Sequence, residues 1–133
     1  MADRSSLQAF AGAALRIVAG AMFACHGAQK ILGWFTDKPT YPVGSQMWIG
    51  GIIELVGGIL IALGLCTRPV ALIASGTMAV AYFQFHWKLA TGNQMFLPIK
   101  NGGELAVLYC FVFLVFAVSG AGAYSLDRRR GRA

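Results

Sequence analysis

The chain has 133 residues, of which 57% are hydrophobic and 12% charged, with a mean hydropathy of +0.64 and a net charge of +6. A soluble domain this small needs a large polar surface, so this composition excludes an ordinary soluble protein. We expect a single membrane domain over residues 1–133. The positive charge is interpreted as a topology signal near anionic lipid and not as nucleic-acid binding.

Four apolar stretches predict helices over about 8–34, 46–66, 69–90 and 102–122. Each is long enough to cross a hydrocarbon core, because about 20 helical residues span about 30 Å. The 17 glycines fit this interpretation, since small residues let membrane helices approach closely. The fold class predicted is therefore all-α, an antiparallel bundle of four transmembrane helices.

Basic residues indicate the orientation of these helices. With four spans both termini share one side, together with Arg4, Arg68 in the turn 66–69, and the tail 128–132. We expect Arg16 to extend to the same side by snorkelling. Lysines 30, 38, 88 and 100 lie opposite. The balance predicts a multi-pass protein with both termini in the cytoplasm.

Titratable residues gather in the outer half of the predicted bundle. His26 and Glu54 each lie eight residues from a predicted helix end, which is about 12 Å deep at 1.5 Å per residue. His86 and Glu104 lie within about one turn of the surface. The sequence thus predicts a deep pair, His26 with Glu54, and a shallow pair, His86 with Glu104, as candidates for ligand binding or proton relay.

Ordinary structural roles compete with these assignments. Glu104 follows Asn101 by three residues, as in a helix-capping arrangement. His86 precedes Trp87 and fits an interfacial residue. Glu54 is harder to explain in this way, because a carboxyl group in mid-membrane costs about 2.5–3.5 kcal/mol on insertion scales. Polar neighbours of these residues form a secondary set of candidates: Gln29, Lys30 and Asn101.

Metal and thiol chemistry receive little support. The Glu-x-x-His pairs of di-iron bundles are absent, and no metal ligand set is expected. A haem held by His26 and His86 would need both residues at one depth, but the sequence places them at different depths. The cysteines Cys25, Cys66 and Cys110 form no C-x-x-C motif and are interpreted as small packed residues.

Several fragments along the chain together resemble one family of small membrane proteins. They are L-R-I through H-G-A-Q-K (15–30), E-L-V-G-G (54–58), G-L-C-T-R (64–68), N-G-G-E (101–104), and G-A-G (120–122) with S-L-D (125–127). In combination they resemble the DoxX family. The resemblance implies a four-helix protein of the bacterial inner membrane, in a family named from a subunit associated with thiosulfate:quinone oxidoreductase. It carries no catalytic role onto His26 or Glu54.

The leading functional hypothesis is a redox-associated membrane component with a quinone-like ligand in the outer-half pocket, together with a partner protein or a second copy. Quinone is the cofactor considered, and whether the chain is itself an enzyme stays open. A non-catalytic assembly or scaffolding subunit is the alternative, in which the polar residues only fasten helices together. Small-solute transport is a third hypothesis, and it would need an oligomer.

Overall fold

The computed structural model describes residues 3–92 and 95–131, so Arg132 of the basic tail lies outside the described residues. All regular elements in these two ranges are helical. In chain order they are α1 (Arg4–Leu32), α2 (Gln46–Leu63), α3 (Thr67–Ala81), the π-helix η1 (Tyr82–His86), the 3₁₀ helix η2 (Leu89–Thr91), α4 (Pro98–Asn101), α5 (Glu104–Ser119) and α6 (Leu126–Arg129).

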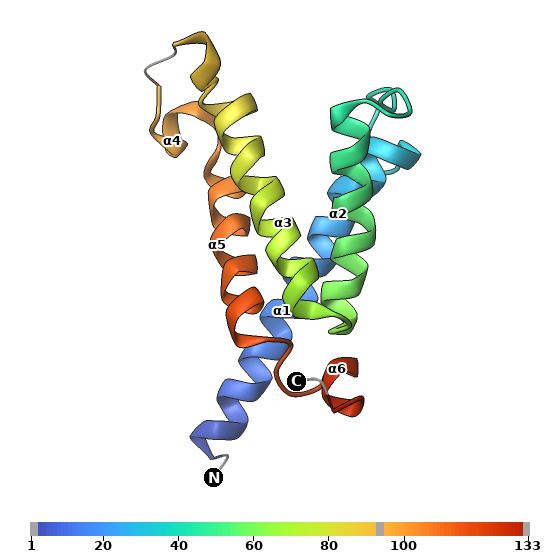
Figure 1. The fold of residues 1–133 in the computed structure, drawn as a ribbon, viewed down its shortest axis with the longest axis vertical. Helices are drawn as coiled ribbons and strands as arrows, with labels where there is room; N and C mark the ends of the chain where they lie inside the picture. Colours follow the sequence, from blue (N-terminus) through green and yellow to red (C-terminus); the bar gives the residue numbers. More distant parts are fainter. Residues whose placement is uncertain (1–2, 93–94, 132–133) are drawn as a thin grey trace.

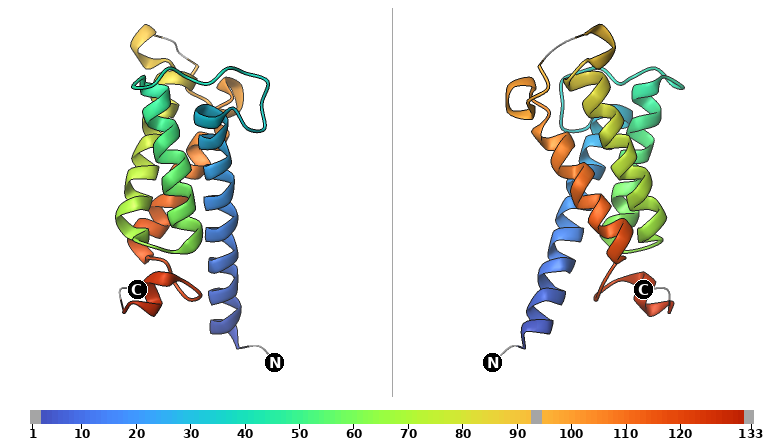
Figure 2. Two further views of the ribbon diagram at one scale, coloured as in Figure 1. Left: turned by 90° about the vertical axis from the view of Figure 1, so that its right-hand side faces the viewer. Right: turned by 60° about the vertical axis from the view of Figure 1, so that its left-hand side comes forward.

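The long helices alternate in direction and form two pairs, α1 with α2 and α3 with α5 (Figure 1). The pairs lie together at the end of the molecule that carries the termini. They diverge toward the end that carries the α1–α2 loop and the segment between η1 and α5 (Figure 1), and Figure 2 shows this end opposite the one that carries the termini. The arrangement is a wedge, narrow at the end with the termini and wide at the end with the loops. For brevity these are called the closed end and the open end.

Two helices of the described chain are long and apolar enough to cross a membrane. They are α1, with 29 residues, and α2, with 18. The sequence predicts four such helices, but α5 has only 16 residues and α3 has 15 before η1 replaces it. Glycine explains two of the early ends, because α2 stops at Gly64, in the left-handed conformation at φ +67°, and α5 stops at Gly120.

Glycines bring α1 and α2 into backbone contact. A Cβ atom on Gly20 would lie 2.6 Å from the backbone N of Ala62, and one on Gly27 would overlap the backbone N of Leu55. Gly58 meets the backbone of Ala24 in the same way. Real Cβ atoms do not approach so closely, so this pair of helices depends on hydrogen atoms at these positions.

We therefore expect Gly27→Ala to lower the stability of the protein strongly, by about 2–3 kcal/mol, because backbone cannot move aside as a flexible side chain can. Gly12→Ala on the same helix is the matched control, since a Cβ there meets nothing within 4 Å. It should be neutral or stabilising by up to about 1 kcal/mol through helix propensity. Thermal unfolding of both variants in one detergent compares them, and equal melting temperatures would contradict the packing described.

Arg16 corrects one expectation from the sequence. It does not snorkel to the surface but is completely buried, at 0% exposure. Its Nη1 donates to the carbonyl oxygens of Ile61 and Ala62 at 3.0 and 2.9 Å, and its Nη2 donates to that of Tyr124 at 2.8 Å. The last carbonyls of α2 carry the negative end of the helix dipole, so they suit a cation. The guanidinium therefore joins α1, α2 and the C-terminal segment.

Asp127 completes this junction at the closed end. Its Oδ1 accepts from the backbone N–H of Cys66 and its Oδ2 from that of Thr67, both at 2.8 Å, at the start of α3. Its own N–H donates to the Gly64 carbonyl at 2.8 Å. Burial alone would raise the pKa of Asp127, but the hydrogen bonds from Thr67 and Cys66 outweigh it and hold that pKa below its usual 3.8. The segments 64–68 and 120–127, far apart in sequence, thus form one contact.

A lowered pKa means that the charged Asp127 stabilises the fold above the pKa of the unfolded chain and that this contribution is lost as the pH falls through the lower folded value. We expect the wild type to lose stability below about pH 4. Asp127→Asn should be less stable at pH 7 by about 1–2 kcal/mol and should lose less on acidification. Asp37→Asn, in the exposed loop, serves as the control. Identical acid profiles for wild type and Asp127→Asn would refute this role.

Candidate functional site: the outer wedge

Two hollows lie between the helix pairs toward the open end. The first, of about 340 Å³, is lined chiefly by α2, α3 and η1, and the second, of about 250 Å³, by α1, α3 and α5. They share five lining residues: Lys30, Glu54, Met78, Ala81 and His86. The larger volume falls within the range of about 300–1,000 Å³ typical of small-ligand sites. We call the two hollows together the outer wedge.

Glu54 lies at the centre of the outer wedge. It is 3% exposed, in the middle of α2. Its Oε1 accepts a hydrogen bond from Lys30 Nζ at 2.6 Å, which makes an ion pair between α1 and α2. Its Oε2 is buried and has no hydrogen-bond partner. One carboxylate oxygen is thus occupied by the protein, and the other is left for something else.

The predicted deep pair is therefore rearranged. Glu54 pairs with Lys30, one turn further along α1 than His26, and His26 lines the same hollow. The imidazole of His26 lies edge-on to the ring of Tyr109, with 6.3 Å between centroids. Lys30 supplies a formal positive charge and a longer reach than imidazole, which favours it as the partner of a buried carboxylate.

The predicted shallow pair is separated. His86 lines both hollows of the outer wedge, and its Nδ1 lies 3.4 Å from the Asn101 carbonyl oxygen. Glu104 is exposed and lines a different, shallow hollow with Pro98 and Leu108. The five-residue π-helix η1 ends at His86, and π turns are frequent at functional sites because they change the direction of a side chain.

The secondary candidates fall in three different places. Lys30 belongs to the outer wedge, as described above. Gln29 donates to the Phe35 carbonyl at 3.2 Å in the loop after α1. Asn101 does not cap α5, whose N-cap is Gly103. Its Oδ1 accepts from the Gly103 N–H at 2.8 Å instead.

Tyr109 is a member of the outer wedge that the sequence pattern does not single out. It is 6% exposed, lines the smaller hollow, and its hydroxyl group is buried with no hydrogen-bond partner. Its ring stacks on Phe113, with 5.4 Å between centroids, and lies 5.5 Å from the ring of Phe23. A phenol in an otherwise apolar helix was the signal available, because a buried hydroxyl usually finds a partner.

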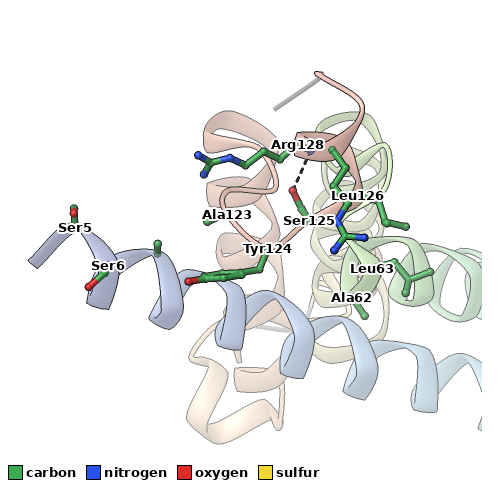
Figure 3. A pocket seen from close by; sticks show the side chains of 11 residues that line it. Ser5, Ser6, Ala62, Leu63, Ala123, Tyr124, Ser125, Leu126 and Arg128 are labelled. Atoms are coloured by element: carbon green, nitrogen blue, oxygen red, sulfur yellow. Dashed lines mark hydrogen bonds between the residues drawn. The ribbon is translucent and has the colours of Figure 1, made fainter. Parts of the chain in front are cut away.

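A larger hollow, of about 1,020 Å³, lies at the closed end between the first turns of α1 and the C-terminal segment (Figure 3). Its polar groups are occupied or exposed. Ser125, the buried one, donates to the Gly122 carbonyl and accepts from the Arg128 N–H. Arg128 is exposed, and Tyr124 is 72% exposed. The outer wedge, in contrast, contains two buried polar atoms without partners, so it is the stronger candidate site.

Comparisons with known proteins identify the family to which the chain belongs. The DoxX family model matches residues 11–87. An uncharacterised protein of Haemophilus influenzae is 46% identical over 122 residues, covering 86% of this chain and 87% of the relative. Inner membrane protein YqjF of Escherichia coli is 31% identical, over 85% of this chain and 86% of the relative. Inner membrane protein YphA of Escherichia coli is 34% identical, over 86% of each chain. No solved structure matches. The chain belongs to the DoxX family.

Proposed function

We propose that the protein spans the inner membrane four times, with both termini in the cytoplasm, and binds a small quinone-type ligand in the outer wedge as part of a redox system. Two relatives named as inner membrane proteins support the location. The continuation of α3 into η1 gives a third helix of nearly spanning length. The basic tail and Arg68 at one end support the orientation.

The observation that carries the ligand proposal is the pair of unpartnered atoms, Glu54 Oε2 and Tyr109 Oη, on one hollow. A carboxylate only accepts hydrogen bonds, whereas a phenol also donates them. A quinol hydroxyl group can donate to Glu54 Oε2, and an oxygen of a quinone or quinol can accept from Tyr109 Oη. The reduced form of the ligand would therefore satisfy both atoms, and the oxidised form would satisfy Tyr109. His26 and His86, which line the same hollow from α1 and η1, are side chains of the type that most often carries protons.

Electrons need a second component. The sequence contains no dinucleotide fingerprint and no metal-type cysteine spacing. In this proposal the chain contributes the ligand site and its proton-exchanging groups, and a partner protein delivers or removes the electrons. Any enzymatic activity then belongs to the assembly of the two.

The test is a binding titration with a soluble quinone analogue on purified protein in lipid nanodiscs. Tyr109→Phe removes a hydroxyl group that bonds to nothing in the protein, so stability should be unchanged or slightly higher. Affinity for the analogue should fall by about tenfold, the value of one good hydrogen bond. Tyr124→Phe, at the closed end, is the matched control and should bind as the wild type does. Unchanged affinity in Tyr109→Phe would reject the proposed site.

One observation favours the scaffolding alternative. The Lys30–Glu54 ion pair links α1 to α2, as a purely fastening interaction would. In that case Glu54→Gln would lower stability, and no variant in the outer wedge would alter the binding of any quinone analogue. Tyr109→Phe distinguishes the two functions. A protein that only holds helices together does not use a hydroxyl group without a partner, so its loss would change no binding property.

A further inference from the structure

The two hollows of the outer wedge differ in what lines them. The smaller one carries the polar groups His26 and Tyr109 in addition to the shared Lys30 and Glu54. The larger one is mainly apolar away from the shared residues, with Met47, Ile49, Ile53, Val80 and Phe85 on its walls. Because Glu54 borders both, the polar hollow and the apolar hollow are compartments of one site.

Their sides toward the surface also differ. Between α1 and α5 the polar compartment is bordered by the buried rings of Phe23 and Tyr109. Its exposed lining is limited to Gly102 and Leu105 at the start of α5. Between α2 and α3 the apolar compartment reaches the surface, where Ile49, Val80 and Phe85 are 50%, 47% and 44% exposed.

Glycine keeps the α2–α3 side open. Gly50 on α2 and Gly76 on α3 both line the apolar compartment, and a Cβ atom on either would meet nothing within 4 Å. In this they differ from Gly27 and Gly58, which are in backbone contact with the neighbouring helix. Close packing therefore does not require glycine at these two positions. What the glycines provide is open space between two helices.

The outer end of this opening is bridged by polar side chains. Gln46, the first residue of α2, donates through Nε2 to Oε1 of Gln84 in η1 at 2.5 Å. Gln46 also lines the apolar compartment. The compartment is thus crossed by an amide bridge toward the loops and is open below it, where exposed apolar side chains would face lipid in the proposed four-span protein.

We infer that the apolar compartment is a lateral portal for the tail of an amphiphilic ligand that enters from the bilayer. The inference rests on the proposed function, and it names the ligand class: a long hydrocarbon tail with a polar head that carries both a hydroxyl donor and an acceptor oxygen, as a quinol does. The head lies in the polar compartment against Glu54 Oε2 and Tyr109 Oη. The tail leaves between α2 and α3, past Gly50 and Gly76, into the outer leaflet.

The experiment compares two quinones with one head group, one without a tail and one with a decyl tail, titrated into nanodiscs. Gly50→Phe fills the portal and should weaken binding of the decyl form more than tenfold. It should leave the affinity for the tail-less form within about twofold of the wild-type value, because that form has no tail to pass through the portal. The tail itself gains little free energy by leaving lipid for an apolar groove, so the substitution acts on it only through steric exclusion. Gly76→Phe, on the opposite wall, should act in the same way. Gly12→Phe, where a Cβ also meets open space but outside the wedge, should change neither affinity.

Each remaining outcome is decisive. If both Gly50→Phe and Gly76→Phe bind the decyl form as tightly as the wild type does, the portal is refuted and the proposed site stands. Equal loss of both quinones would mean that the compartment holds the head, which also overturns it. Selective loss of the decyl form in Leu105→Phe in place of the glycine variants would move the exit to the start of α5. If the wild type binds neither quinone, the proposed function and the portal both fail.

Discussion

In the Lys30→Met variant we expect the apparent stability to fall by about 3 kcal/mol, since removing one partner of a buried ion pair leaves the other charge uncompensated. Glu54 is 3% exposed and has no other hydrogen bond, so its carboxylate has no alternative partner in the described chain. The value is placed at the lower end of the range because the Lys30 side chain is 23% exposed and solvent screens part of the attraction. Thermal unfolding in a single detergent measures it.

The double variant Lys30→Met/Glu54→Leu separates this effect from simple loss of packing. Replacing a buried pair by apolar residues of similar size is often neutral. We expect the double variant to lie within about 1 kcal/mol of the wild type and to be more stable than Lys30→Met alone. Lys100→Met, at an exposed position, should have no effect. If the double variant is as unstable as the sum of its single variants, the ion pair does not couple the two residues.

Arg16→Met should also destabilise the protein by about 3 kcal/mol, because three backbone carbonyls lose a charged donor inside the protein. Arg16→Lys should recover only part of this, since an ammonium group cannot match the geometry of two guanidinium nitrogens donating to separate carbonyls. In both variants the C-terminal segment should loosen, because Nη2 holds the Tyr124 carbonyl. Limited trypsin digestion at Arg128 and Arg129 reports that loosening directly.

Arg68→Met is the matched control for Arg16. Arg68 is an exposed arginine near the same end, with a hydrogen bond from Nη1 to the Val118 carbonyl at 2.9 Å. Its replacement should change stability by less than about 1 kcal/mol, as is usual for exposed charges. Equal melting temperatures for Arg16→Met and Arg68→Met would show that the buried junction at the closed end does not stabilise the fold.

Composition and apolar length were sufficient to predict an all-helical membrane protein, and α2 begins at residue 46 as predicted. The ends of helices were predicted less well. α1 begins at Arg4, because the helix includes a polar first turn that precedes the apolar stretch. α3 gives way to a π-helix, whose wider turn depends on tertiary packing. Neither feature leaves a periodic signal in the sequence.

The sequence places His26, Glu54 and His86 in one half of the bundle and the structure brings them to one hollow, but the pairing of Glu54 differs from the predicted one, and the site itself stays a prediction. Depth along a helix follows from residue number, which is why His26, Glu54 and His86 line one region. Pairing also depends on how each helix is rotated, and a shift of four residues on α1 was enough to replace His26 by Lys30. The same limit explains Arg16, which lies eight residues from the predicted helix start and was expected to snorkel, but whose side chain faces the carbonyls of α2.

The most direct test of the central claim is an experimental structure of the protein purified with its native lipids or with a quinone analogue. We predict ligand density in the outer wedge, with a ligand oxygen within hydrogen-bonding distance of Tyr109 Oη and, for the quinol form, a hydroxyl group within that distance of Glu54 Oε2. We also predict that this density is weaker in Tyr109→Phe at the same ligand concentration, while the Lys30–Glu54 pair remains. A wedge closed by its own side chains, with those two atoms bonded to each other or to other protein groups, would contradict it.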